Sequence, residues 1–104
     1  MKKRGNVSEV LPLDDDVVRH YIHQGEFPLA LEALMQQYQG PILLYCYCLL
    51  LDQDLAQEVA QDVFVTAFEK LSCLRKDSSL NAWLYGIATN KCLERRRNSN
   101  RRDT

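Results

Sequence analysis

The chain has 104 residues, 46% of them hydrophobic, and its 13 basic and 14 acidic side chains give a net charge of −1. This length suits one domain with a modest core. The longest apolar run, residues 42–51, is far shorter than the roughly 18 residues of a membrane span. The polar N-terminus also lacks the apolar stretch of a secretory signal. We therefore expect a cytoplasmic single-domain protein without a membrane span.

The near-zero net charge hides an uneven distribution along the chain. Residues 80–104 hold six basic and two acidic side chains, a net of +4, whereas residues 1–79 have a net of −5. A basic end predicts a polyanionic partner, and an acidic body argues against non-specific wrapping by nucleic acid. The alternative is a solvated helix end, because Lys and Arg near a helix C-terminus also stabilise the helix dipole.

The first half of the chain predicts a tail and two helical segments. Residues 1–13 are polar or mixed, and we expect a flexible tail there. The three aspartates at 14–16 fit the cap and acidic first turn of a short helix. Apolar residues then recur at threes and fours over 31–49, and Pro28 suits a first helical turn. Gly40 and Pro41 interrupt this pattern, so either the helix kinks or a new helix begins at Pro41.

A cap near Asp52 is expected to open the next helix, which runs over about 54–71. Its apolar residues form one broad face: Leu55, Ala56, Val59, Ala60, Val63, Phe64, Ala67 and Leu71. Its opposite face carries Gln57, Glu58, Gln61, Asp62, Val65 and Glu69. A polar helix face is ordinarily just solvated. The like charges of Glu58 and Asp62 around an exposed glutamine, with an exposed valine below, favour a docking surface as the alternative.

The stretch 80–97 predicts a helix of about five turns, which Ser78 or Ser79 can cap. Spacing at 100° per residue places one apolar stripe in the core: Leu80, Leu84, Ile87 and Ala88. A neighbouring side carries Trp83, Gly86, Asn90 and Arg97. An aromatic ring beside amide and guanidinium donors suits bases and phosphates, although a lone tryptophan is more often a core residue.

The cysteines and histidines do not predict a metal site. Cys46 and Cys48 are two apart on an expected helix, so they point about 200° apart and cannot share a metal. His20 and His23 could reach one metal, but no third ligand stands at an obvious spacing. We expect four free thiols, most of them buried, with no metal and no cofactor. The chain also lacks a Gly-rich phosphate loop and a nucleophile–base pair, so we do not expect an enzyme.

Two separated motifs resemble those of one protein family. The stretch AQEVAQDVFVTAFEKL, residues 56–71, is similar to the acidic pair, glutamine, acid and phenylalanine of region 2 in bacterial sigma factors of the extracytoplasmic-function (ECF) group. The stretch AWLYGIATNKCLERRR, residues 82–97, is similar to the WLY, IA and Asn run that the same family follows with an acid and arginines. Patterns and resemblance agree on an all-α fold, a compact bundle of three long helices plus a short N-terminal one, over residues 14–97.

The resemblance implies a transcription initiation factor domain. In the family the first motif docks on the clamp helices of the RNA polymerase β′ subunit. By position this role falls on Glu58, Gln61 and Asp62, with Gln57, Val65 and Glu69 around them. In the family the second motif melts the promoter minus-ten element and holds the non-template single strand, with a flipped base in a loop pocket. By position this role falls on Arg75, Lys76, Ser79, Asn81, Trp83, Asn90, Lys91, Arg95, Arg96, Arg97, Arg101 and Arg102.

Departures from the family pattern bear on these expectations. Gln57 stands where an acid is more common and Glu94 where aspartate is, and Gly86 replaces a bulkier, often basic residue, which shortens the reach toward DNA.

The family's second domain, region 4, has no counterpart here. We expect residues 98–104 to begin an interdomain linker, so that the chain is either a fragment or a single-domain relative. An anti-sigma factor is a further expected partner. The alternative function is a sigma mimic that binds an anti-sigma factor without touching DNA.

Overall fold

The computed structural model describes residues 15–76 and 78–103, and side chains only as far as residue 98. Within these residues the regular structure is entirely helical: α2 (Asp15–His23), α3 (Phe27–Leu50), α4 (Gln53–Lys70), the short 3₁₀ helix η1 (Leu71–Cys73) and α5 (Leu80–Asp103). The predicted all-α fold, with three long helices and a short N-terminal one, is confirmed. The flexible tail predicted for residues 1–13 lies outside the described residues.

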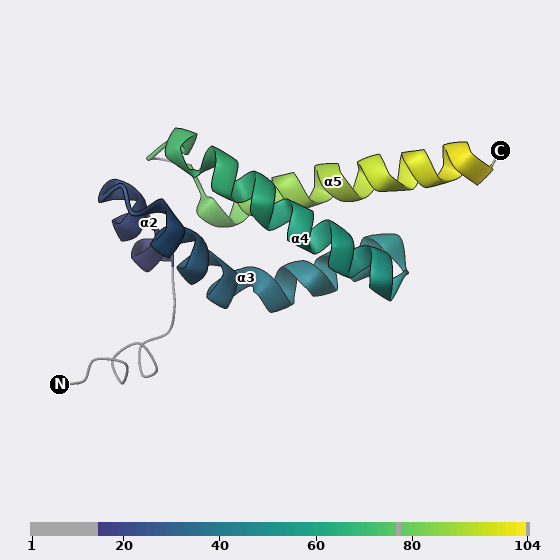
Figure 1. The fold of residues 1–104 in the computed structure, drawn as a ribbon, viewed down its shortest axis with the longest axis horizontal. Coiled ribbons are helices and arrows are strands. Elements are labelled where there is room, and N and C mark those ends of the chain that lie inside the picture. The colour runs from purple at the N-terminus through teal and green to yellow at the C-terminus, as the bar shows by residue number, and fades with distance from the viewer. Residues whose placement is uncertain (1–14, 77, 104) are drawn as a thin grey trace.

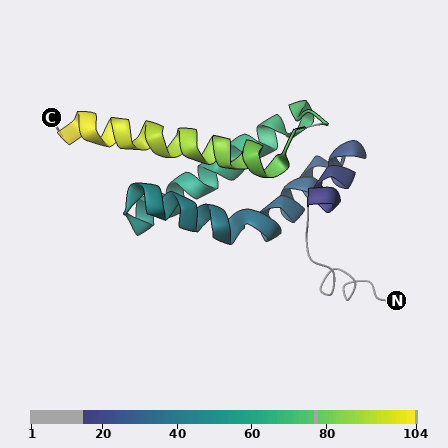
Figure 2. The ribbon, with the colours of Figure 1, turned by 180° about the vertical axis from the view of Figure 1, so that it is seen from behind.

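The three long helices pack as a bundle, and α2 covers the beginning of α3 (Figure 1). Each of the three long helices contacts the other two. The last turns of α5 project beyond the other helices in both views of the ribbon (Figure 2). The part of the chain that carries the arginine run therefore extends outward from the helical body.

Helix α3 continues through Gly40 and Pro41, so the alternative of a new helix at Pro41 is wrong. Proline lacks the N–H that would bond to the carbonyl four residues earlier, which weakens a helix at that point. Tyr38 and Ile42, which are both buried, hold α3 in the core on either side of the proline. At the other end of α3 the Leu51 N–H donates to the Tyr47 carbonyl at 2.7 Å and closes the helix.

The core takes its side chains from all four α-helices. Its largest fully buried residues include Val18, Leu34, Ile42, Val59, Val63, Leu71, Leu80 and Leu84. On α5 the predicted stripe is confirmed at Leu80, Leu84 and Ala88, while Ile87 is partly buried at its edge. One face of α4 and one face of α5 are thus held inside the domain, which leaves their opposite faces for partners.

Helix α5 runs to Asp103, so the helix end predicted at Arg97 was wrong. Residues 98–103 contain neither proline nor glycine, and the basic side chains near this terminus suit the helix dipole. Nothing in the local sequence therefore stops the helix at 97. The predicted domain boundary falls inside a helix, and the role of residues 98–104 as the start of a linker stays a prediction.

The four cysteines are free thiols that divide into a buried and an exposed pair. Cys46 and Cys92 are buried and Cys48 and Cys73 are exposed, so the expectation that most are buried holds for only half of them. Burial is the main cause that raises the pKa of Cys46 to about 12, and it also raises the pKa of Cys92. Because the thiolate is the reactive form, the two buried thiols should be inert in the native domain.

We therefore expect two classes of thiol in a titration with a chromogenic disulfide reagent at pH 8. A thiol with a pKa near 12 holds only about one part in ten thousand as thiolate at that pH. Cys48 and Cys73 should react at once, and Cys46 and Cys92 only as fast as the domain unfolds. Replacing Cys48 and Cys73 with serine should remove the fast phase. Four thiols that react equally fast without denaturant would contradict this division.

Candidate functional site

The solvent face of α4 exposes all six residues that the sequence assigns to polymerase docking: Gln57, Glu58, Gln61, Asp62, Val65 and Glu69. The residues between them, such as Val59 and Val63, are buried and fix which way the helix faces. Two apolar side chains also lie open to solvent on α4, since Val65 is 55% exposed and Phe68 is 41% exposed. Phe68 was assigned to neither face by sequence reasoning. The face is therefore partly apolar as well as acidic.

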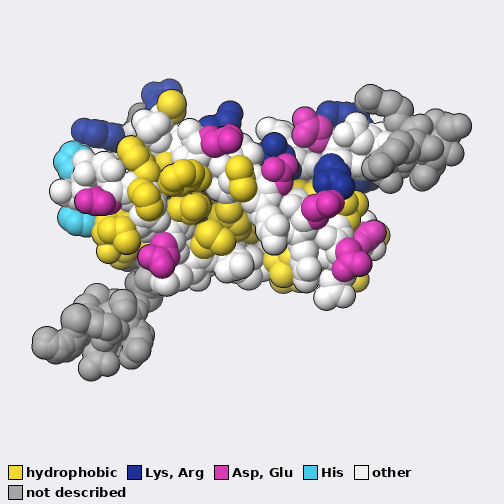
Figure 3. Space-filling model, viewed as in Figure 1, with side chains coloured by type: hydrophobic (Ala, Val, Ile, Leu, Met, Phe, Trp, Pro, Cys, Tyr) yellow, Lys and Arg dark blue, Asp and Glu magenta, His cyan; other side chains and the backbone are white. Residues whose placement is uncertain are grey.

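A groove between α3 and α4 borders this face. It has a volume of about 210 Å³ and is lined by Met35, Gln39, Leu43, Gln57, Ala60, Gln61 and Phe64. Gln57 and Gln61 therefore stand on the wall of a hollow whose other lining is largely apolar. Figure 3 shows hydrophobic side chains gathered between α2, the first half of α3 and the end of α4. Sequence reasoning missed the α3 residues, because only helix packing brings them beside α4.

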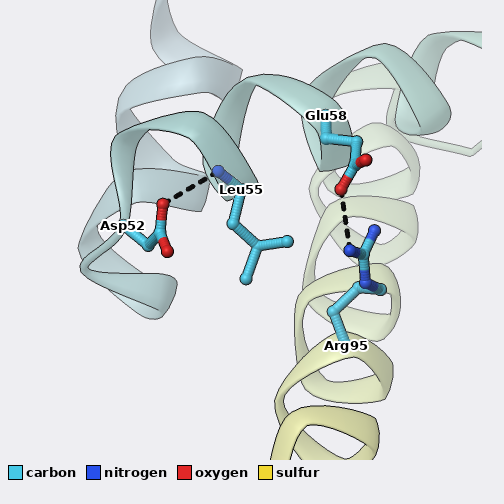
Figure 4. Close-up of polar contacts among 4 residues, drawn as sticks. All are labelled: Asp52, Leu55, Glu58 and Arg95. Carbon is cyan, nitrogen blue, oxygen red and sulfur yellow. Dashed lines mark hydrogen bonds and ion pairs between the residues drawn. The ribbon is translucent and has the colours of Figure 1, made fainter.

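In the described part of the chain, two ion pairs join the acidic face of α4 to the basic side of α5. The Arg95 Nη2 atom lies 2.7 Å from Glu58 Oε1 (Figure 4), and Lys91 Nζ lies 3.6 Å from Asp62 Oδ2. Two carboxylates predicted to meet polymerase thus neutralise two cations predicted to meet DNA. The pairs are solvent-exposed, so each contributes about 0–1 kcal/mol to stability. The fold makes the two predicted surfaces neighbours rather than separate regions.

The rest of the basic side of α5 is accessible. Asn90, Arg96 and Arg97 are exposed, and neither arginine forms an ion pair with another of the described side chains. Trp83 packs partly against the core and keeps part of its ring exposed, so it combines the two roles weighed for it. A Cβ atom at Gly86 would meet nothing within 4 Å, which leaves an open surface beside that ring. Arg101 and Arg102 lie in α5, but their side chains are outside the described part.

The loop before α5 is organised by two serines. Ser79 Oγ accepts the Ala82 N–H at 3.1 Å and caps α5, so of the two predicted candidates Ser79 is the cap. Ser78 Oγ donates to the Arg75 carbonyl at 2.8 Å and closes a turn. The side chains of Arg75 and Lys76 are exposed on this turn. The hydroxyl oxygen of Ser79 therefore supports the helix, and the cations beside it remain accessible to a phosphate backbone.

Asn81 belongs to a polar cluster that sequence reasoning did not foresee. Its Nδ2 atom lies 3.5 Å from the Tyr38 hydroxyl, which donates to Asp15 Oδ1 at 2.8 Å. Gln37 Nε2 donates to the same carboxylate oxygen at 3.0 Å, and Gln37 Oε1 is buried without a hydrogen-bond partner among the described residues. Burial is the main cause that raises the pKa of Tyr38, so its hydroxyl stays a donor at neutral pH. With Asp16, this cluster lines a hollow of about 400 Å³.

Within residues 15–76 and 78–98, no three His, Cys, Asp or Glu side chains gather as metal ligands would. None of the described helices has the length and apolarity that crossing a bilayer demands. That the chain is not an enzyme and holds no metal or cofactor stays a prediction. The two helix faces and the loop between them are the features that call for a partner.

The comparisons with known proteins agree with this geometry. Residues 34–102 match the family model of sigma-70 region 2. The chain is 39% identical over 61 residues to the RNA polymerase sigma-H factor of Pseudomonas aeruginosa, an alignment that covers 59% of this chain and 32% of that protein. It is also 39% identical over 59 residues to the RNA polymerase sigma factor YlaC of Bacillus subtilis, covering 57% of this chain and 34% of that protein.

The chain thus spans about a third of the length of the curated relatives it matches. No solved structure matches it. The family model reaches from the first third of α3 through α4 and nearly to the end of α5, which are the elements that carry both candidate surfaces. The chain belongs to the sigma-70 region 2 family.

Proposed function

We propose that this chain is a cytoplasmic domain of a transcription initiation factor with two binding surfaces. Helix α4 binds the clamp helices of the RNA polymerase β′ subunit. The loop before α5, together with α5, captures the non-template strand of the promoter minus-ten element. The observation that carries the proposal is the opposed chemistry of two adjoining helix faces. Helix α4 exposes carboxylates and amides beside an apolar groove, whereas α5 exposes Arg97 on the side of Trp83 and Arg96 on another side of the same helix.

The groove beside α4 supports docking of a helical protein partner. A face that is merely solvated has no need of an apolar hollow or of the exposed Val65 and Phe68. Fully burying a large apolar side chain that was fully exposed is worth about 1.5–3 kcal/mol, and Val65 and Phe68, which are about half exposed, can each contribute part of that amount. The carboxylates of Glu58, Asp62 and Glu69 favour a partner with basic side chains and orient it on the face. Apolar contact and charge complementarity together suit a helix that lies along α4.

The loop and α5 support capture of a single strand without covalent chemistry. Unstacking a base costs a few kcal/mol, and stacking one base on an aromatic ring returns about 1–3 kcal/mol. Trp83 offers part of such a ring, Asn81 offers an amide at the first turn of α5, and Arg96 and Arg97 attract phosphates. Melting is then the trapping of a strand that has transiently opened, because the domain binds the open form better than the closed one.

The polymerase contact is tested by replacing Gln61 with arginine. Gln61 is uncharged and exposed on the groove wall, and it takes no part in the two ion pairs to α5. The change therefore places a cation in the acidic face without removing a partner from either pair. We expect at least about tenfold weaker binding to a β′ clamp-helix fragment, because a like charge at a basic partner is strongly unfavourable. Helical circular dichroism should be unchanged.

The matched control is Gln24→Arg, which adds the same charge in the exposed turn after α2. It should leave binding to the fragment unchanged. If both variants weaken binding equally, only net charge matters and α4 is not the docking face. Unchanged binding by Gln61→Arg would reject the assignment outright.

A second candidate function is that of a sigma mimic, which binds an anti-sigma factor and never meets DNA. The ion pairs favour it, because Glu58 and Asp62 neutralise Arg95 and Lys91 and so reduce the charge that α5 can offer a phosphate backbone. The exposed Arg96 and Arg97 favour the initiation factor instead. Binding of single strand and duplex with equal affinity would support the mimic.

A further inference from the structure

Arg19, near the middle of α2, reaches across to the loop before α5. Its Nη1 atom lies 3.4 Å from the Arg75 carbonyl oxygen and 3.3 Å from that of Lys76, and its Nη2 atom donates to the Ser78 carbonyl. These acceptors are 56 to 59 residues away along the chain. One guanidinium group thus donates hydrogen bonds to three backbone carbonyls of a single turn. Its planar set of N–H groups with fixed directions is suited to binding several acceptors at once.

Within the loop, Ser78 donates to the Arg75 carbonyl through Oγ at 2.8 Å and through its N–H at 3.3 Å, and Arg19 adds the hydrogen bonds that tie this turn to α2. Leu71 is fully buried and Leu74 is partly buried, so the loop is anchored where it leaves η1. The cap by Ser79 anchors it where α5 begins. Between these points the loop faces α2 across a hollow of about 440 Å³, lined by Arg19, Ile22, His23, Leu74 and Lys76. Because open space cannot hold a backbone by packing, hydrogen bonds set the course of the turn.

Helix α2 also reaches the first turn of α5. Asp15, the first residue of α2, accepts a hydrogen bond from Tyr38, and the Tyr38 hydroxyl lies within reach of the Asn81 amide. The short helix is therefore linked to the proposed strand-binding loop and helix at two places, directly through Arg19 at the loop and indirectly, through Asp15 and Tyr38, at the start of α5. All of α2, with both Arg19 and Asp15, precedes the stretch 34–102 that matches the family.

We propose that Arg19 is a positioning residue for strand capture. By holding the carbonyls of Arg75, Lys76 and Ser78 toward α2, it fixes how the loop enters α5 while the side chains of Arg75 and Lys76 stay exposed. The captured base then meets a loop that is already shaped, so little ordering has to accompany binding. This inference rests on the proposed function, because it takes the loop to be the base reader.

The test compares the 104-residue chain with Arg19→Ala, Arg19→Lys and a charge-matched control. Lys70→Ala is that control, since it removes one exposed cation at the end of α4, away from the loop carbonyls. The first measurement is the backbone order parameter of Lys76 and Ser78 by ¹⁵N relaxation. In Arg19→Ala these values should fall from about 0.85 toward 0.6 or less, which marks a flexible backbone. Arg19→Lys should lie between, because an ammonium still donates but has no fork.

The second measurement is affinity for a panel of single-stranded oligonucleotides that differ by one base at each position. The wild-type chain should discriminate at one position by at least about fivefold. Arg19→Ala should lose that discrimination while its affinity for the β′ clamp-helix fragment and its salt dependence stay the same. Arg19→Lys should retain part of the preference, and Lys70→Ala all of it.

The outcomes separate this inference from the proposed function. A wild-type chain without base preference contradicts the proposed function, and the inference falls with it. A wild-type preference that survives in Arg19→Ala contradicts the inference alone, even if that variant melts at a lower temperature. A salt slope lowered by about 0.7 with the base preference intact would make Arg19 a phosphate contact instead. Unchanged order parameters at Lys76 and Ser78 would show that Arg19 does not hold the loop.

Discussion

Truncation of Leu84 to alanine is expected to lower the free energy of unfolding by about 3 kcal/mol. Leu84 is 0% exposed in the middle of the buried stripe of α5, and leucine-to-alanine changes in cores cost about 2–5 kcal/mol because they leave a cavity. The total stability of a small domain is only about 5–15 kcal/mol. The melting temperature should therefore fall by about 12–24 °C for a domain of this size. Urea denaturation followed by circular dichroism measures the free energy of unfolding, and a thermal scan followed in the same way measures the melting temperature.

The matched control is Leu93→Ala on the same helix. Leu93 is 40% exposed, so its truncation removes a similar side chain with much less loss of buried contact. We expect a loss below about 1 kcal/mol there, a small fraction of the loss in a core position. Equal losses at Leu84 and Leu93 would mean that α5 does not pack in this orientation. The faces assigned to DNA and to the core would then have to be exchanged.

Neutralising Arg96 and Arg97 together is expected to weaken binding to a minus-ten-like single strand by about 25-fold at 0.1 M salt. Affinity for a single strand is proportional to the salt concentration raised to the power of about −0.7 for each phosphate neutralised. Lowering the salt from about 1 M to about 0.1 M therefore strengthens each contact about fivefold, and the loss of one contact costs that factor at about 0.1 M. The slope of log affinity against log salt should become less steep by about 1.4. Fluorescence anisotropy of a labelled oligonucleotide over a series of salt concentrations measures both effects.

The comparison with Arg95→Ala makes this result specific. Arg95 already pairs with Glu58 at 2.7 Å, so it releases fewer counterions on binding and its loss should change the slope less than the loss of Arg96. Glu58→Gln should have the opposite effect and strengthen binding, because it frees Arg95. The wild-type chain alone should bind weakly, in the range of about 10⁻⁴–10⁻⁶ M. If neither the loss of Arg96 and Arg97 nor Arg95→Ala alters the affinity or the salt slope, the arginine run is a solvated helix end and the sigma mimic is favoured.

Local sequence signals determined the helices and their buried faces. The Asp52 cap on the Leu55 N–H, the Ser79 cap and Pro28 in the first turn of α3 each involve residues within one turn, so spacing alone predicts them. The apolar period placed Leu80, Leu84 and Ala88 inside for the same reason. The predicted end of α5 at Arg97 was six residues too early. No proline or glycine stops the helix there, and without such a residue the local sequence does not define where a helix ends.

Only the tertiary structure decided which distant side chains meet. Glu58 contacts Arg95 across 37 residues, Tyr38 approaches Asn81 across 43, and Arg19 reaches the loop carbonyls across 56 or more. Helical periodicity gives the direction of each side chain around its own axis, but not which helix lies opposite or at what height. Those are set by how the cores of α3, α4 and α5 interlock. For that reason sequence motifs located both candidate surfaces, while the ion pairs between them, the α3 wall of the groove and the Arg19 contact with the loop followed from packing alone.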